Sequence, residues 1–504
     1  MDTPTMKDPG TTSEESVGSP IETTSKRVGR PKGRQATASK RRGQPATRSA
    51  HVMVPSRSRT EHYAAGKALR TKCPRDAHAV WKTPSDRRDA VELVLEAEKG
   101  RMQDLLPLRR GRMVKSAFTF YRGAALTMAT DLAVTPTTGI RVQCCGDAHL
   151  CNFGGFATPE RRLIFSINDL DETLPAPWEW DVKRLAPSFV VACRDNHLSE
   201  AVAKDAAMTC VRSYRESMAE FSQLKTLELW YQALEVSELM AGLPSAIRKR
   251  VQKRLEKERA KSRGEELFPK LAEKRGNHHV IKDQLPTIFH HEDHPPGEVQ
   301  QAVRDVLAAY VGTLPSAYQS LAHRYELKDA AIKVVGVGSV GTACWVLLFM
   351  AGDNDPLFLQ VKEARASVLE PYAGQSVFPN HGQRVVDGYR RMQPSSDMLL
   401  GWSRGPKRDY FIRQLRDMKV GPMVETFGQT EMDLYATWCG RALALSHARS
   451  GNAAMISGYM GKSDAFDRAM AAFSKSYADR NEKDHAALAR AIRTGTVKAV
   501  FEEE

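Results

Sequence analysis

The chain has 504 residues, of which 41% are hydrophobic and 27% are charged. This balance is typical of soluble globular proteins and excludes collagen-like and wholly disordered chains, while the length allows one large two-lobed domain or several domains. No apolar run approaches the ~18 residues that a membrane span requires, and the N-terminus has no apolar signal core. We therefore expect a cytoplasmic protein with no membrane contact.

Half of the net charge of +14 lies in residues 1–60, which hold twelve Lys and Arg against five Asp and Glu. This segment nearly lacks aromatic residues, so it cannot bury enough apolar surface to offset the entropy of ordering, and we predict a disordered basic tail. Within it, the sequence from Arg27 to Arg34, Arg-Val-Gly-Arg-Pro-Lys-Gly-Arg, resembles an AT-hook, which binds a narrow minor groove of DNA. The alternative is a solvated tail that contacts DNA or other polyanions only weakly, through residues 26–59.

Apolar positions become periodic from about residue 61. The pattern predicts helices over 86–105 and 118–132, short strands over Arg141–Cys145 and Leu163–Ile167, and successive amphipathic helices over 181–240. Residues 248–263 hold nine basic and two acidic residues, which favours a helix with a solvated face over a second DNA contact. The cluster from His290 to His294 is interpreted as loop histidines, because adjacent residues on a Pro-flanked loop lack the spacing of metal ligands.

The composition changes again near Ala331. Short runs of β-branched and aromatic residues predict three antiparallel strands, over Ile332–Val335, Thr342–Met350 and Pro356–Val361. A helix over 381–393, a strand over Asp409–Leu415 and helices over 431–495 follow. The eight cysteines include no Cys-x-x-Cys pair, so we expect reduced and mostly buried thiols.

Two polar loops follow predicted strands. The first, Gly146-Asp-Ala-His-Leu-Cys-Asn152, places Asp147 and Asn152 five residues apart, so that it can present a carboxylate to a hydroxyl group and an amide oxygen to a cation. The second holds Asp169 and Asp171, and hard divalent ions prefer oxygen ligands of this kind. The alternative for each loop alone is an ordinary acidic turn, but their order and spacing together are more specific.

The first loop resembles the catalytic loop of the aminoglycoside and choline kinase branch of the protein-kinase-like superfamily, His-Gly-Asp-x-His-x-x-Asn. Gly146, Asp147, His149 and Asn152 match it, whereas Cys145 stands in place of the first His. The resemblance implies that Asp147 orients and deprotonates an acceptor hydroxyl and that Asn152 holds Mg²⁺. Asp169, in a less closely matching second loop, would bridge the metal to the nucleotide, with Asp171 as the competing ligand.

A nucleotide-binding part is indicated far downstream. Gly336, Gly338 and Gly341 form a Gly-x-Gly-x-x-Gly loop that is followed by a predicted strand rather than a helix, which favours a kinase flap over a dinucleotide-binding turn. Lys362 ends the next strand, as in the kinase Val-Ala-Ile-Lys motif. The resemblance implies that the glycines admit the phosphates of ATP and that Lys362 neutralises them. An acidic partner for Lys362 is expected on the following helix, where Glu370 is the nearest acid and Gln383 and Asp387 occupy the helical stretch.

The order of these motifs is rotated relative to ordinary kinases. Tyr410–Leu415 resembles the strand that leads to a kinase hinge, and Leu434–Arg449 resembles the helix that normally precedes the catalytic loop. The resemblance therefore implies an α+β fold that is a circularly permuted, two-lobed, protein-kinase-like fold. The expected parts are a tail over 1–60, a helical catalytic lobe over 61–325, a small nucleotide-binding β lobe over 326–424, and C-terminal helices over 425–504 that complete the large lobe.

Residues 85–495 also resemble an uncharacterised bacterial family, domain of unknown function 2252, which brings no established activity. The segments that carry this resemblance begin at Phe120, Gly146, Ile167, Trp178, Leu359 and Gln414. Asp181 is expected to brace the catalytic loop, while Arg122 and Arg184 would either pair with carboxylates or touch phosphate. The leading hypothesis is an ATP- and Mg²⁺-dependent phosphotransferase acting on an unknown hydroxyl-bearing small molecule or protein. The alternatives are a nucleotide-binding regulator without catalysis and a DNA-associated protein that uses its tail.

Overall fold

The computed structural model describes residues 57–261, 267–290, 301–352, 355–415 and 418–502. The AT-hook-like segment and His291–His294 lie outside these residues. Residues 1–56 of the predicted tail also lie outside the described residues, and helix α1 (Arg59–Ala68) begins two residues before position 61. Ser58 accepts a hydrogen bond from the amide of Glu61 and donates its own amide to the Glu61 carboxylate, which satisfies two free donors of the helix start.

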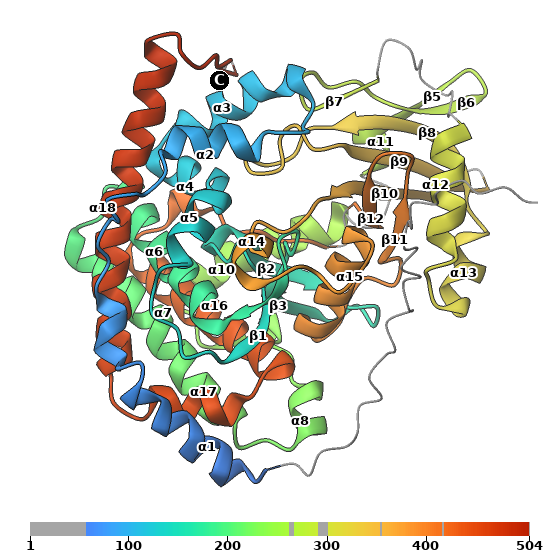
Figure 1. Ribbon diagram of the computed structural model, residues 1–504. Helices are drawn as coiled ribbons and strands as arrows, with labels where there is room; N and C mark the ends of the chain where they lie inside the picture. The colour runs from blue at the N-terminus through green and yellow to red at the C-terminus, as the bar shows by residue number, and fades with distance from the viewer. Residues whose placement is uncertain (1–56, 262–266, 291–300, 353–354, 416–417, 503–504) are drawn as a thin grey trace, which may run out of the picture. The chain divides into compact units, whose positions relative to one another are not determined.

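The fold is of the α+β class, and its largest sheet has six antiparallel strands in the order β11-β12-β10-β9-β8-β7 (Figure 1). Its strands are β7 Ile288–Phe289, β8 Glu326–Lys333, β9 Cys344–Ala351, β10 Asp355–Ala364, β11 Gly401–Arg404 and β12 Asp409–Gln414. Three antiparallel pairs accompany it: β1 Arg141–Cys144 with β4 Leu174–Pro177, β2 Phe153–Ala157 with β3 Leu163–Ile167, and β5 Ala272–Arg275 with β6 His278–Ile281. The predicted strands over Thr342–Met350 and Pro356–Val361 correspond to β9 and β10, whereas the one over Ile332–Val335 shares only residues 332 and 333 with β8, which ends at Lys333.

Helices from both ends of the sequence share the largest hydrophobic core. The central members are α6 Trp178–Asp195, α7 Glu200–Phe221, α16 Gln429–Ser450, α17 Ala453–Met460 and α18 Ala465–Arg493. Helix α16 packs along α7, and α18 packs against both α6 and α7. Trp178 and Tyr214 stack in this core with ring centroids 5.7 Å apart. The C-terminal helices are therefore an integral part of the helical body that precedes the sheet in sequence.

Shorter helices surround this body and the sheet. They are α2 Ala90–Ala97, α3 Leu106–Val114, α4 Ala117–Gly123, α5 Ala125–Leu132, α8 Thr226–Tyr231, α9 Val236–Ala241, α10 Ser245–Lys261, α11 Phe268–Leu271, α12 Gln301–Val311, α13 Ser316–Ala322, α14 Glu370–Ala373 and α15 His381–Met392. Helix α12 packs on β11, and α15 packs on β10, β11 and β12. Leu307, Tyr310 and Leu314 join the hydrophobic core of the sheet, so the chain just before residue 325 packs with the strands that follow it.

Two predicted helices are interrupted. Over 86–105 only Ala90–Ala97 is α-helical, because Asp89 caps its start and Gly100, with a φ of 78°, reverses the chain soon after its end. The segment 118–132 forms α4 and α5 with a break at Ala124. There the carbonyl of Gly123 accepts a hydrogen bond from the Arg109 guanidinium at 2.9 Å, a bond to another segment in place of one within the helix.

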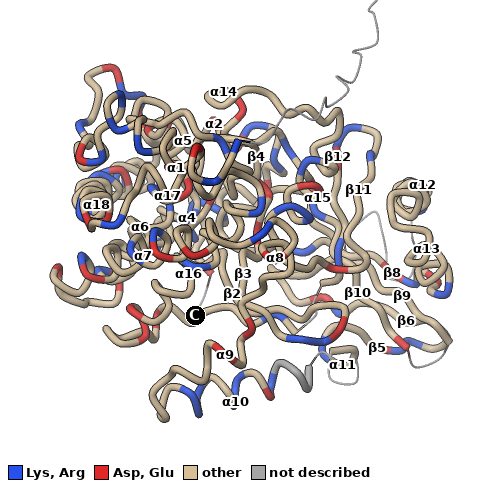
Figure 2. The backbone as a smooth tube through the Cα atoms, turned by 90° about the horizontal axis from the view of Figure 1, so that it is seen from below, with Lys and Arg blue, Asp and Glu red and all other residues tan. Residues whose placement is uncertain are grey.

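The basic segment 248–263 is helical from Ser245 to Lys261 in α10, and Figure 2 shows lysines and arginines along it. Most of the described side chains of α10 are exposed, as expected of a solvated face. Within the described residues, no helix combines the length and the apolar character that crossing a membrane demands. All eight cysteines are free thiols, and seven of them are buried.

Candidate functional site

The loop that carries Asp147 is held in place from two distant helices. Asp181, on α6, accepts hydrogen bonds from the amides of Cys145 at 2.6 Å and Gly146 at 3.0 Å. His447, on α16, donates from Nε2 to the same Asp181 carboxylate at 3.0 Å. Gly146 has a φ of 83°, and a Cβ there would lie 2.3 Å from the carbonyl oxygen of Glu172, so only glycine fits this turn. The prediction that Asp181 braces the loop is confirmed.

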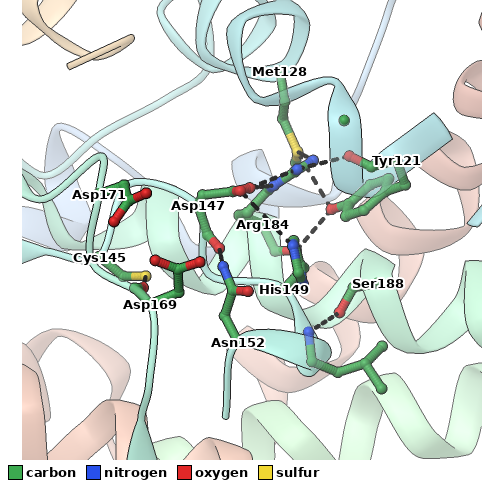
Figure 3. A network of polar contacts seen from close by, with 12 residues as sticks. Tyr121, Met128, Cys145, Asp147, His149, Asn152, Asp169, Asp171, Arg184 and Ser188 are labelled. Carbon is green, nitrogen blue, oxygen red and sulfur yellow. Dashed lines mark hydrogen bonds and ion pairs between the residues drawn. The ribbon is translucent and has the colours of Figure 1, made fainter. Parts of the chain in front are cut away.

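Asp147 is paired with an arginine. Arg184 donates from Nε at 2.9 Å and from Nη2 at 2.7 Å, both to Oδ1 of Asp147, and its guanidinium lies over the Tyr121 ring (Figure 3). The second carboxylate oxygen lies 3.7 Å from Nε2 of His149. Oδ1 of Asp147 is therefore engaged by Arg184, Oδ2 is not, and the residue lines the cleft described below. Of the two expectations for Arg184, the pairing with a carboxylate is the one observed.

Asn152 and His149 complete the first loop. The side-chain amide of Asn152 donates to the backbone carbonyl of Asp147 at 2.7 Å, which fixes the amide group and leaves Oδ1 for another partner. Burial, together with the positive charges of Arg184 and Arg122, lowers the pKa of His149 to about 4, against the opposing charge of Asp147. His149 is therefore neutral at neutral pH and supports the loop as an uncharged ring.

The second loop meets a strand from the other half of the chain. Nζ of Lys362, on β10, lies 2.6 Å from Oδ2 of Asp171 and 3.4 Å from Oδ1 of Asp169. Lys362 is 3% exposed, whereas both carboxylates are partly exposed. Lys362 and its two acidic neighbours thus form one compact charged cluster built by tertiary contact.

These three groups control one another's protonation. Burial opposes ionisation, but the positive charges of Lys362 and Arg413 lower the pKa of Asp169. Burial and the negative charge of Asp169 raise the pKa of Asp171 to about 7. The pKa of Lys362 is raised: burial works against its charged form, and the two carboxylates outweigh burial. The cluster therefore favours the charged forms of Lys362 and Asp169, and Asp171 holds a proton more tightly than an ordinary carboxyl group does.

The expectation of an acidic partner for Lys362 on the following helix is wrong. Glu370 binds the amide of Ser367 and lies 3.8 Å from His381, and Asp387 pairs with Arg391. Helix α15 instead presents Arg384, which donates to the carbonyl oxygens of Asp171 and Thr173. Asp169 and Asp171, from the second polar loop, are therefore the partners of Lys362 in place of an acid on the following helix.

The glycine loop joins β8 to β9, and upstream arginines hold its carbonyl groups. Arg101 donates to the carbonyl oxygens of Gly338 at 2.7 Å and Val340 at 2.8 Å, and Arg112 donates to that of Gly336 at 2.8 Å. Gly336 and Gly341 have φ angles of 62° and 84°, which glycine adopts without strain. The loop is thus pre-positioned by residues that its own sequence does not reveal.

A single cleft of about 310 Å³ lies between the loops, and it is lined by residues of both halves of the chain. Of the predicted site residues, those that line it are Asp147, His149, Asn152, Asp169, Asp171, Gly336 and Gly338. Lys362 stands behind the two aspartates, and Gly341 forms the outer end of the loop, where its carbonyl accepts the amide of Met102. Figure 3 shows Asp147, Asn152, Asp169 and Asp171 around one space.

The oxygen atoms at this space fit a divalent cation. Oδ1 of Asp171 is buried and has no hydrogen-bond partner in the part of the chain that the structure describes. Asp169 and Asn152 line the same cleft, and hard cations prefer the carboxylate and amide oxygens that such side chains carry. Asn152, Asp169 and Asp171 are therefore the residues that could hold a divalent cation here.

Sequence reasoning missed several residues around the cleft. Arg413 donates to the carbonyl of Asn168 at 3.1 Å and to the Tyr389 hydroxyl at 2.6 Å, and thereby links the sheet to the loop before Asp169. Arg101, Arg112 and Arg365 were likewise not predicted, because each meets its partner through contacts distant in sequence. His290 lies between Asp283 and Asp329, at 2.8 and 3.2 Å, in agreement with a loop histidine.

Comparison with known proteins gives one match. The model of a protein family described as "Uncharacterized protein conserved in bacteria (DUF2252)" matches residues 101–491. This span covers well over half of the chain and contains every predicted site residue. No curated protein and no solved structure matches the chain.

Proposed function

Because the chain belongs to the DUF2252 family that its motifs predicted, and the family description names no activity, we propose a function from the site itself. We infer that the protein is an ATP- and Mg²⁺-dependent phosphotransferase that acts on a hydroxyl group of a small molecule or a protein. One observation carries the proposal: Lys362 and the Asp169–Asp171 loop, from opposite halves of the chain, meet at the cleft that Asp147 and Asn152 line.

The same proposal includes the fold. We infer a protein-kinase-like fold in which the usual order of parts is circularly permuted. The sheet with the glycine loop and Lys362 follows the two polar loops in sequence, and helix α16, which packs on β1 and β3 beside those loops, comes after the sheet. A cut between that helix and the strand before Gly146 accounts for this order.

Each group then has a role. The free oxygen of Asp147 would accept a hydrogen bond from the acceptor hydroxyl and receive its proton. Asn152, Asp169 and Asp171 would hold Mg²⁺, which when bound neutralises the phosphate charge. Lys362 would share its charge between the two aspartates and the nucleotide, and the glycine loop would let main-chain amides approach the phosphates.

A second candidate is a nucleotide-binding regulator without catalysis. The observation that favours it is the pairing of Asp147 with Arg184 through two hydrogen bonds to one oxygen. This pairing holds one carboxylate oxygen of Asp147 in a contact within the protein. The partner of Lys362 also differs from the helix glutamate of active kinases.

The substitution Asp147→Asn tests both candidates, since it preserves the shape of a side chain whose complete removal would leave Arg184 unpaired. For a phosphotransferase we expect the rate of ADP formation from ATP to fall about a hundredfold or more, while stabilisation by ATP with Mg²⁺ in a thermal-shift titration persists. Asp104→Asn, at an exposed position, serves as the matched control. Unchanged turnover in Asp147→Asn would sink the phosphotransferase proposal. Stabilisation of the wild type by ATP with Mg²⁺, without turnover on any acceptor, would support the regulator.

A further inference from the structure

Four arginines line the cleft, and three of them are bound to main-chain carbonyl groups. Arg101 holds the glycine loop, Arg109 binds Glu98 and the carbonyl of Gly123, and Arg365 binds the carbonyls of Ala97 and Lys99. The donors of these three side chains are therefore largely used in holding the walls of the cleft.

Arg122 differs from them. Among the residues that the structure describes, its guanidinium has no hydrogen-bond or ion-pair partner, and its Nε atom is buried. Its guanidinium carbon lies over the ring of Phe118, 6.0 Å from the ring centroid. An arginine keeps its charge in a protein, so an unpaired buried donor is unfavourable unless a ligand binds it. The side chain is half-buried and faces the cleft.

The position of Arg122 connects the two ends of the site. It lies in the last turn of α4, and its carbonyl oxygen is 3.3 Å from the point where a Cβ of Gly338 would stand, so the residue adjoins the glycine loop. The positive charge of Arg122 also contributes to the lowered pKa of His149, which lines the cleft with Asp147. Arg122 thus adjoins the predicted phosphate loop through its backbone and lines the same cleft as Asp147 and His149.

We propose that Arg122 binds an oxyanion, a phosphoryl or carboxylate group, of the ligand that occupies the cleft. The planar fork of donors of an arginine matches two oxygens of such a group. The Asp147 carboxylate, which lines the same cleft, is already paired through Oδ1 with Arg184. The oxyanion has two sources: the terminal phosphoryl group of the nucleotide or an acidic group on the acceptor. The inference rests on the cleft being the ligand site of the proposed function, but it does not require turnover.

The test uses inorganic phosphate and pyrophosphate as probes, with the full chain and without nucleotide. We expect both anions to raise the melting temperature of the wild type, and Arg122→Gln to weaken their binding about tenfold or more. Arg122→Lys should restore part of the affinity, because it keeps the charge and loses the fork. Arg490→Gln, which removes an exposed arginine from α18, should bind the anions as the wild type does.

A purely structural role for Arg122 makes a different prediction. Removal of an unpaired charge should leave the ligand-free protein as stable as the wild type or more stable, whereas loss of a structural contact would lower its melting temperature. The inference is overturned by equal anion binding in the wild type and Arg122→Gln, or by no anion binding in either. Phosphate binding through Arg122 in a protein that never turns over ATP would reject the phosphotransferase and leave this site intact.

Two nucleotides distinguish the sources of the oxyanion. If Arg122 holds the terminal phosphoryl group, Arg122→Gln should abolish the difference in stabilisation between ATP and ADP, each with Mg²⁺. If it holds an acidic group of the acceptor, that difference should persist. In that case phosphate added to the ADP-bound protein should still stabilise the wild type and fail to stabilise Arg122→Gln.

Discussion

Nζ of Lys362 lies 2.6 Å from Oδ2 of Asp171, although β10 carries the lysine and a loop in the other half of the chain carries the aspartate. The lysine is nearly inaccessible, and Asp169 is its second acidic neighbour at 3.4 Å. The sheet and the helical body are therefore joined, at the cleft, by a charged cluster rather than by apolar packing alone.

The cluster predicts a specific pattern of stability. Lys362→Met should lower the free energy of unfolding by about 2 kcal/mol, less than for a fully buried pair because the carboxylates are partly exposed. The double variant Lys362→Met/Asp171→Asn should recover much of that loss, since it removes the unpaired acid as well. Urea denaturation measures both. If Lys362→Met unfolds at the wild-type urea concentration, the cluster contributes nothing to stability.

The raised pKa of Asp171, about 7, predicts a pH-dependent affinity for Mg²⁺. Below pH 7 the cation must displace a proton from this carboxyl group, so the affinity should fall by up to about tenfold per pH unit between pH 7 and 6 and level off above pH 8. Asp171→Asn should bind Mg²⁺ more weakly and without this dependence. Calorimetric titration with Mg²⁺ at several pH values measures it.

Asp169→Asn is the matched control for that experiment. Removal of the Asp169 charge lowers the pKa of Asp171, so the pH dependence should persist but move to lower pH. The raised pKa of Asp171 also affects the stability of the wild-type protein. Because the folded protein holds a proton on Asp171 that the unfolded chain has released above pH 4, this carboxyl should make the protein less stable as the pH rises from about 4 to 7. An Mg²⁺ affinity that is constant from pH 6 to 8 contradicts this assignment.

The Asp181 brace predicts coupling between two helices. In Asp181→Asn, an amide NH₂ group replaces one of the carboxylate oxygens that accept hydrogen bonds from the loop amides and from His447. We expect this substitution to lower the free energy of unfolding by about 2–3 kcal/mol. His447→Gln removes the partner on α16, which also accepts from the Tyr214 hydroxyl. In a double-mutant cycle measured by urea denaturation, the two losses should be non-additive by more than about 0.5 kcal/mol. Additive losses would show that His447 does not act on the loop through Asp181.

The sequence predicted the local features of the site because they are encoded locally. Asp147, Asn152 and Asp169 follow buried strands, and the Gly-x-Gly-x-x-Gly loop lies between two strands, so motif spacing and strand pattern were sufficient to select them. The structure brings Asp147, Asn152 and Asp169 to one cleft with two of the three loop glycines. Neither the polar loops nor the glycine loop indicated by itself that the two would meet. Only the resemblance to protein kinases predicted it.

The partners of these residues were not predictable in the same way. Arg184 lies on a helix that reads as apolar core, and its pairing with Asp147 is set by the packing of α6 beneath the loop. The acid beside Lys362 was sought on the next helix, but hydrogen bonds from Arg384 hold the Asp171 loop against β10 instead. Ion pairs between distant segments leave no periodic signal in either sequence, so only the fold reveals them.

Alanine substitutions in the glycine loop should destabilise the protein to different degrees, because the three glycines differ in φ angle and in the space around them. Gly341 combines a φ of 84° with close contact, since a Cβ would lie 3.2 Å from Cβ of Arg101; Gly336 has a φ of 62° but open space around it. Gly338 has neither a positive φ nor a contact closer than 3.3 Å. We therefore expect Gly336→Ala to lower the free energy of unfolding by about 1–2 kcal/mol through backbone strain. Gly341→Ala should lower it more, and Gly338→Ala should change it little.

The same glycine substitutions should also differ in their effect on ATP binding. Gly341→Ala displaces Arg101, the residue that holds the carbonyls of Gly338 and Val340, so it should weaken stabilisation by ATP with Mg²⁺ beyond what its effect on folding explains. Arg101→Gln should reproduce that loss without backbone strain, and this makes it the control for the role of the arginine. Thermal-shift titrations of the four variants measure both effects. If Gly341→Ala and Gly338→Ala bind ATP equally well, the position of the loop does not depend on Arg101, and the loop adapts to the nucleotide only when the nucleotide binds.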